Sequence, residues 1–171
     1  MQSHTPWKTW TFIGVLALSP FVADRSQASG PGNADDYVGT FYAALADRAE
    51  ILHIHADGTA GITLSDQVTA GAGGFTFSDS MGSWRVTGNR RLSARFLNLN
   101  FDITGQAPTY SGMAVVDYDP HFAPNLRSFA ASCAGKIYPS GQDPFAPGAV
   151  PVTEFDCAYL NGNPYRRMPL P

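Results

Sequence analysis

A long β-type run reads RLSARFLNLNFD, from Arg91 to Asp102. Successive side chains of a strand point to opposite faces. One face carries, in order, Leu92, Ala94, Phe96, Asn98 and Asn100; the other carries Ser93, Arg95, Leu97, Leu99 and Phe101. The apolar side therefore switches midway. A strand that bends or bulges across a barrel wall gives this pattern, and so does one passing from a packed interior to a polar mouth. Both interpretations favour a β-barrel over a flat sandwich.

Other runs with strand character flank this stretch, separated by turn clusters at spacings typical of an all-β domain. Asp57-Gly58 is a strong hairpin signal, and Pro120 is expected to end the strand before it. The predicted strands are Tyr37–Leu45, Glu50–Ala56, Thr59–Ser65, Ser83–Gly88, Arg91–Asp102, Thr109–Asp119, Arg127–Tyr138 and Val150–Leu160. A helix from an Asn33 cap is the alternative for the first run. Eight strands with mostly short connections predict an antiparallel up-and-down β-barrel.

The N-terminus carries an export signal in its composition. Residues 11–23 are an apolar run (TFIGVLALSPFVA) of signal-peptide length, shorter than the roughly 20 residues that a membrane-spanning helix needs. Ser26 and Ala28 suit the −3 and −1 positions of a cleavage site. We therefore expect a signal peptide over 1–28, a linker over 29–36, a barrel domain over 37–171, and a secreted or periplasmic location. An uncleaved N-terminal anchor is the alternative.

Charge and cysteine content narrow the class of protein further. The chain has a net charge of −3, which disfavours binding to nucleic acid or to an anionic membrane surface. No stretch after the signal region is apolar enough to span a bilayer. Cys133 and Cys157 are the two cysteines, and export favours a disulfide between them. Two buried free thiols are the alternative.

Three short motifs resemble those of a known family of β-barrel proteins. Gly39-Thr40-Phe41-Tyr42 resembles the glycine–x–tryptophan–tyrosine start of a lipocalin barrel, with Phe41 in place of the tryptophan. Val116-Asp117-Tyr118 resembles the later aspartate–tyrosine motif, and Arg166-Arg167 stands where a closing arginine is expected. The chain is thus similar to the calycin group, lipocalin-like barrels that include relatives shaped like allene oxide cyclase. The resemblance implies an early aromatic packed on a late arginine, and an interior that binds, or in some members isomerises or cyclises, apolar molecules.

The run FAASCAG, Phe129–Gly135, presents small residues on both faces. Small residues opposite large aromatic ones would leave room inside a barrel, and apolar pockets with a few polar groups are the usual form of small-molecule sites. The expected pocket residues are Trp84, Phe96, Asn98, Asn100, Tyr110, Phe129, Phe155 and Tyr159. An ordinary packed core explains the same pattern equally well.

Asp117, Tyr118 and His121 form the densest set of titratable groups near one strand end. A carboxylate, a phenol and an imidazole at a barrel mouth are suited to acid–base work on an enolisable ligand. The alternative, which the sequence favours, is a strand that runs into a polar turn.

His53 and His55 point to one face of their strand, as a metal site requires, and His121 or Asp119 is a conceivable third ligand. The expected state is nevertheless a solvated face without metal. Ala70–Gly74 is not a phosphate loop, because no Gly-Lys-Ser/Thr follows it, and it is expected to be a flexible loop. The sequence therefore predicts no cofactor.

The sequence is compatible with three functions. The first is an exported barrel that binds an apolar or aromatic small molecule. The second is an isomerase or cyclase on that scaffold, and the third is a non-catalytic structural or protein-interaction domain. A buried, isolated ionisable group in a pocket would favour the second, and a filled barrel with an exposed apolar patch would favour the third.

Overall fold

A computed structural model describes residues 33–67 and 74–171 of the chain. The strands are β1 Gly39–Ala44, β2 Ala49–Ile54, β3 Thr59–Leu64, β4 Phe75–Phe77, β5 Ser80–Gly88, β6 Arg91–Asp102, β7 Thr109–Phe122, β8 Ser128–Pro139, β9 Thr153–Asp156 and β10 Tyr165–Arg167. The described residues also include three short 3₁₀ helices: η1 Ala34–Tyr37, which precedes β1, η2 Ser65–Gln67 and η4 Ala158–Leu160. The predicted signal peptide and most of the glycine-rich loop 70–74 lie outside the described residues.

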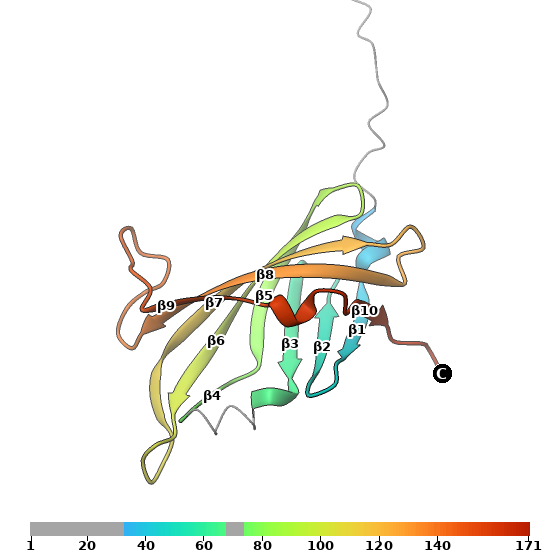
Figure 1. Ribbon diagram of the computed structural model, residues 1–171. Coiled ribbons are helices and arrows are strands. Elements are labelled where there is room, and N and C mark those ends of the chain that lie inside the picture. Colours follow the sequence, from blue (N-terminus) through green and yellow to red (C-terminus); the bar gives the residue numbers. More distant parts are fainter. Residues whose placement is uncertain (1–32, 68–73) are drawn as a thin grey trace, which may run out of the picture.

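The strands form one antiparallel sheet in the order β10-β1-β2-β3-β5-β6-β7-β8-β9. The sheet closes because β10 pairs with β8 as well as with β1. Eight strands thus make a closed β-barrel, as the sequence predicted, and β4 and β9 extend it by pairing with β6 and β8 (Figure 1). The Asp57-Gly58 hairpin is also confirmed: it joins β2 to β3, and Gly58 has a φ of +85°.

The predicted strands differ from the observed ones in several details. The first strand begins at Gly39, because Ala34–Tyr37 forms a 3₁₀ turn after the Asn33 cap. The short strands β4 and β10 were missed, since three-residue runs give little periodicity. The barrel's eighth strand is β10. The predicted strand Val150–Leu160 contains only the four residues of β9, which lies outside the closed ring, followed by η4.

The strand β7 also continues through Pro120 to Phe122, which corrects the predicted end at Asp119. Proline lacks an N–H and normally disrupts a sheet ladder. Pro120 pairs with Ala131 of β8 but has no register partner on β6. The missing N–H therefore removes no ladder bond on that side.

One end of the barrel is filled by aromatic rings, and we call it the closed end. Its residues are Tyr37, Phe41, Phe122, Phe129 and Tyr165, each at most 1% exposed. The rings meet edge-on or stacked, with centroids 4.6 to 5.5 Å apart. Such pairs stabilise beyond the burial of their area, by about 0.5–1.5 kcal/mol each.

Arg167 covers the closed end. Its guanidinium lies 4.7 Å from the ring centroid of Phe41. It donates hydrogen bonds to the carbonyl oxygens of Val38 at 2.7 Å, Asp36 at 2.8 Å and Leu126 at 3.3 Å. The packing of an early aromatic on a late arginine, expected from the resemblance, is therefore present.

Candidate ligand cavity

A cavity of about 490 Å³ occupies the other half of the barrel. Residues from most of the strands line it: Arg48, Ile62, Leu64, Asp66, Phe75, Phe77, Ser80, Phe96, Asn98, Asn100, Ala114, Val116, Tyr118, Ile137, Thr153, Phe155, Cys157 and Tyr159. Most of these side chains are aromatic or aliphatic. The volume lies within the range of small-molecule sites, whose walls are mainly apolar with a few placed polar groups.

The inner face of β6 changes from apolar to polar residues along the strand. This change corresponds to the change from the filled end of the barrel to the cavity. Leu92 and Ala94 are buried near the closed end, and Phe96, Asn98 and Asn100 continue the same inner face along the cavity. The ladder with β7 stays regular from Ala94 to Asn100 and shifts only after Asn100. The strand therefore passes from a packed interior to a polar region, the second of the two interpretations open from the sequence.

Five of the eight expected pocket residues line the cavity: Phe96, Asn98, Asn100, Phe155 and Tyr159. The other three do not. Trp84 is buried next to the β2–β3 hairpin, where its Nε1 donates to the carbonyl oxygen of His55 at 2.9 Å. Phe129 belongs to the closed end, and Tyr110 is 40% exposed beside Phe101, with ring centroids 6.3 Å apart.

The small-residue run makes room for an aromatic side chain at one glycine. Gly135 of β8 faces inward opposite Phe155 of β9, and a methyl group at Gly135 would overlap the Phe155 ring. Because glycine has no side chain, the ring lies against the strand and forms part of the cavity wall. The run thus supports a ring rather than simply leaving empty space.

Asp117, Tyr118 and His121 are not brought together. Tyr118 is 5% exposed and points into the cavity. Asp117 and His121 are exposed on the other side of the wall, and Asp117 makes a paired contact with Arg95, at 2.6 and 2.9 Å. Alternation along β7 separates them, so the three groups cannot act on one substrate.

The histidine pair lies on the outer side of β2. The rings of His53 and His55 are stacked with centroids 6.2 Å apart, and Nδ1 of His53 is 3.1 Å from the hydroxyl oxygen of Thr40. Within residues 33–67 and 74–171, no group of three or more His, Cys, Asp or Glu side chains is arranged to hold a metal ion.

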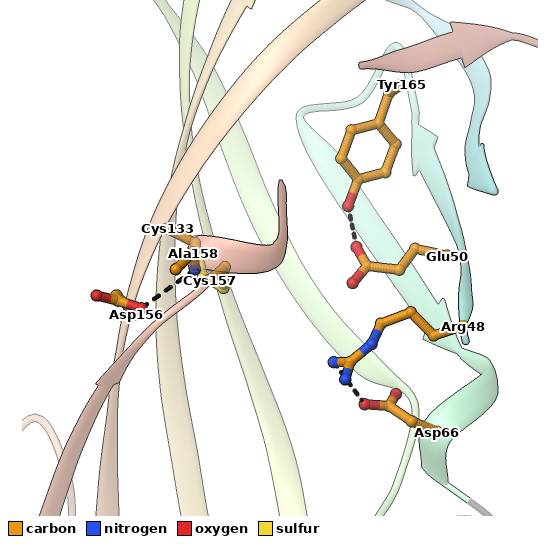
Figure 2. The surroundings of a disulfide bond; sticks show 8 residues. All are labelled: Arg48, Glu50, Asp66, Cys133, Asp156, Cys157, Ala158 and Tyr165. Carbon is orange, nitrogen blue, oxygen red and sulfur yellow. Dashed lines mark hydrogen bonds and ion pairs between the residues drawn. A yellow bond between two sulfur atoms is a disulfide. The ribbon is translucent and has the colours of Figure 1, made fainter. Parts of the chain in front are cut away.

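Glu50 is the functional candidate that the sequence prediction missed. The side chain is fully buried, and the hydroxyl of Tyr165 donates to its Oε2 (Figure 2). The hydroxyl groups of Tyr159 and Tyr118 lie close enough to this carboxyl group to be coupled to it electrostatically, and its Oε1 has no hydrogen-bond partner among the described residues. Strand alternation carries the missed signal: if Leu52 and Ile54 face the core, Glu50 faces it too.

Burial dominates the electrostatics of this cluster. It raises the pKa of Glu50 above its ordinary value, and the charge of Asp66 adds to the rise, while the hydrogen bonds from Tyr165 and Tyr159 oppose it. Burial likewise raises the pKa of Tyr118, Tyr159 and Tyr165, with the charge of Glu50 contributing. All three phenols therefore keep their protons at neutral pH. Tyr118 and Tyr159, which line the cavity, therefore add uncharged hydroxyl groups to its mainly apolar wall.

Arg48 and Asp66 lie at the edge of this cluster, and neither was predicted. Nη1 of Arg48 is 3.1 Å from Oδ2 of Asp66, with the two side chains 25% and 22% exposed. The guanidinium also lies 4.4 Å from the ring centroid of Tyr159. Figure 2 shows the pair beside Glu50, facing the segment that carries the disulfide.

Cys133 and Cys157 form a disulfide, with their Cα atoms 5.3 Å apart. It anchors residues 157–164, which we call the seam segment, because this segment crosses from β9 to β10 over the part of the wall between β8 and β1 (Figure 1). The backbone hydrogen bonds of the seam segment are local: Leu160 to Cys157, Asn161 to Ala158 and Asn163 to Leu160. This segment is therefore held by its side chains and the disulfide, and not by hydrogen bonds to a neighbouring strand.

No family model matches the chain, and no curated protein or solved structure matches it significantly. Among the described residues, no helix is long and apolar enough to cross a membrane.

Proposed function

We propose that the protein binds an apolar or aromatic small molecule inside its barrel. The single observation that carries the proposal is the 490 Å³ cavity, whose mainly apolar wall includes the amides of Asn98 and Asn100. Both asparagines are less than 10% exposed. A few placed polar groups in an apolar wall orient a ligand, whereas a barrel that served only as a scaffold would be expected to fill with side chains.

Titration with N-phenyl-1-naphthylamine tests the proposal, because this neutral dye becomes strongly fluorescent when it leaves water. We expect saturable binding of one dye per chain. Ala114 lines the cavity on β7, so Ala114→Phe should fill it and weaken binding by about tenfold or more. The matched control is Ala134→Phe on the exposed face of β8, which should bind the dye as the wild type does.

Two results would contradict cavity binding: no saturable signal from the wild type, or equal loss of binding in both alanine variants. Thermal melts of each variant separate loss of the cavity from loss of the fold. Ala114→Leu serves as a milder cavity-filling variant if Ala114→Phe does not fold.

The proposal includes export and kinship with calycin barrels. An apolar run of signal-peptide length and a disulfide, which forms and persists in oxidising compartments, support a secreted or periplasmic location. An eight-stranded closed barrel with Arg167 packed on Phe41 supports the kinship. Fold alone does not choose between binding and catalysis.

A second candidate is acid–base isomerisation of the bound molecule, and Glu50 is the observation that favours it. Buried carboxyl groups with a raised pKa are typical of catalytic acids and bases. Tyr159 and Tyr118, which line the cavity, are electrostatically coupled to Glu50. These residues replace Asp117 and His121 in this role.

Solvent deuterium exchange tests this second candidate. With 2-decanone as a bound, enolisable probe, the wild type should speed exchange at the α-carbons above the rate in buffer. Glu50→Gln should abolish the increase while still binding the dye. If the exchange rate with saturating protein equals the rate in buffer, catalysis is contradicted and only the binding function is left.

A further inference from the structure

Arg48 and Asp66 are the charged residues among the described residues that line the cavity. Their 3.1 Å ion pair cancels most of the charge that either would present to a ligand. Asp47 lies close to the same guanidinium, with Oδ1 3.6 Å from Nε. Two carboxylates therefore surround the one cation at this edge of the cavity.

Among the described residues, the deeper wall offers no positive charge to an anionic ligand. Asn98, Asn100 and Ser80 are neutral, and Nδ2 of Asn98 lies 3.3 Å from the hydroxyl oxygen of Ser80. The tyrosines in front of Glu50 stay protonated. Moving a carboxylate out of water into such a site costs several kcal/mol unless a cation or several donors compensate for the lost hydration.

We infer that the ligand of this cavity is an uncharged apolar molecule, and that apolar carboxylates such as fatty acids are rejected. The inference rests on the proposed binding function and adds the charge class of the ligand. The carboxylates near Arg48 supply the rejection: Asp66 and Asp47 already neutralise the guanidinium, so an entering anion would have to compete with them for it. Asp66 is thus a specificity-determining residue.

Competition at pH 7.5 against bound N-phenyl-1-naphthylamine tests the inference with three ligands of one chain length. Decanol and methyl decanoate are neutral, and decanoate carries the charge. We expect both neutral ligands to displace the dye at concentrations at least about tenfold lower than decanoate does, since an unpaired charge is expensive in an apolar site.

Asp66→Asn removes the nearer of the two carboxylates from Arg48, so it should improve displacement by decanoate severalfold and leave decanol unchanged. Glu154→Gln is the matched control, because it removes one negative charge from the exposed outer side of β9, where Glu154 pairs with Lys136 at 3.4 Å. It should leave the displacement curves of all three ligands unchanged.

Equal or tighter binding of decanoate than of decanol in the wild type would overturn the inference and leave the proposed binding function intact. Absence of any dye binding would overturn both. The wild-type comparison alone decides the inference if Asp66→Asn does not fold.

Discussion

The ring of Phe155 in β9 lies directly against Gly135 in β8, in the space that any larger residue's Cβ would occupy. This contact places the side chain of Phe155 on the inner wall of the barrel. It lies where β9 pairs with β8 and extends the sheet beyond the eight strands that close the barrel. Phe155 is 39% exposed, so it borders both the cavity and the solvent. The contact thus helps to shape the edge of the cavity.

Gly135→Ala should displace the Phe155 ring and destabilise the fold by about 1–3 kcal/mol, the usual cost of overpacking. Dye affinity should fall with it, since part of the wall moves. Gly61→Ala in β3 is the control, because a methyl group there would meet its nearest neighbour, the carbonyl oxygen of Ser80, at an ordinary 3.7 Å. Urea unfolding of both variants measures the difference, and equal stability of the two would refute the contact.

Arg167→Met tests whether Arg167 stabilises the closed end of the barrel. The methionine keeps an apolar chain over Phe41 but removes the donors to three carbonyl groups. We expect a loss of roughly 2–3 kcal/mol in the free energy of unfolding, because charged donors are lost and acceptors are left unpaired. Arg166→Met, at the exposed neighbouring position, should change stability by less than about 0.5 kcal/mol. Similar losses in both variants would contradict the assigned role.

Strand alternation predicted much of this architecture, since a barrel wall with one buried face imposes a period of two on every long strand. The run Arg91–Asp102 indicated both the barrel and its polar inner region. The short elements were beyond this signal. β10 has three residues, yet it closes the sheet, and only its pairing with β8 and β1 reveals that role.

The cavity was predicted less completely than the fold. Phe96, Asn98 and Asn100 follow from the face of one strand, whereas Trp84 and Phe129 share the inner face but lie at the filled end. Sequence periodicity gives the face of a residue and not its depth along the barrel. Glu50 was missed although it lies two residues before Leu52 and so shares its inner face; carboxylates are seldom fully buried, and residue type alone gives no signal for this one.

Removal of the disulfide by Cys133→Ala/Cys157→Ala should destabilise the protein by about 3 kcal/mol, on the chain-entropy model for a loop of this length. The seam segment carries cavity residues Cys157 and Tyr159, so dye affinity should also weaken. Thermal unfolding with and without reductant checks both points. Reductant should lower the melting temperature of the wild type and leave the double variant unchanged; a wild type insensitive to a reductant that cleaves the bond would contradict this.

Glu50 should make stability depend on pH. Its pKa is raised in the folded protein, so the folded state holds the proton more tightly than the unfolded state, whose value is about 4.5. Stability is therefore greatest below that value and falls as pH rises toward the folded pKa, by up to about 1.4 kcal/mol per pH unit.

Glu50→Gln keeps the shape of the side chain and cannot ionise. Its stability relative to the wild type should improve as pH rises above about 4.5 and should level off above the folded pKa of Glu50, as followed by urea unfolding at each pH. Glu154→Gln, whose side chain is exposed, is the control and should show only a small change over the same range. A constant difference between Glu50→Gln and the wild type would show that the pKa of Glu50 is not raised.

A crystal structure of the protein grown with saturating decanol would show whether the barrel holds an apolar ligand. We expect continuous density for the alkyl chain between Phe96, Phe155 and Tyr159, with the hydroxyl group near Asn98 or Asn100. A cavity filled by the protein's own side chains, or one that holds only ordered water while decanol is bound elsewhere, would contradict it.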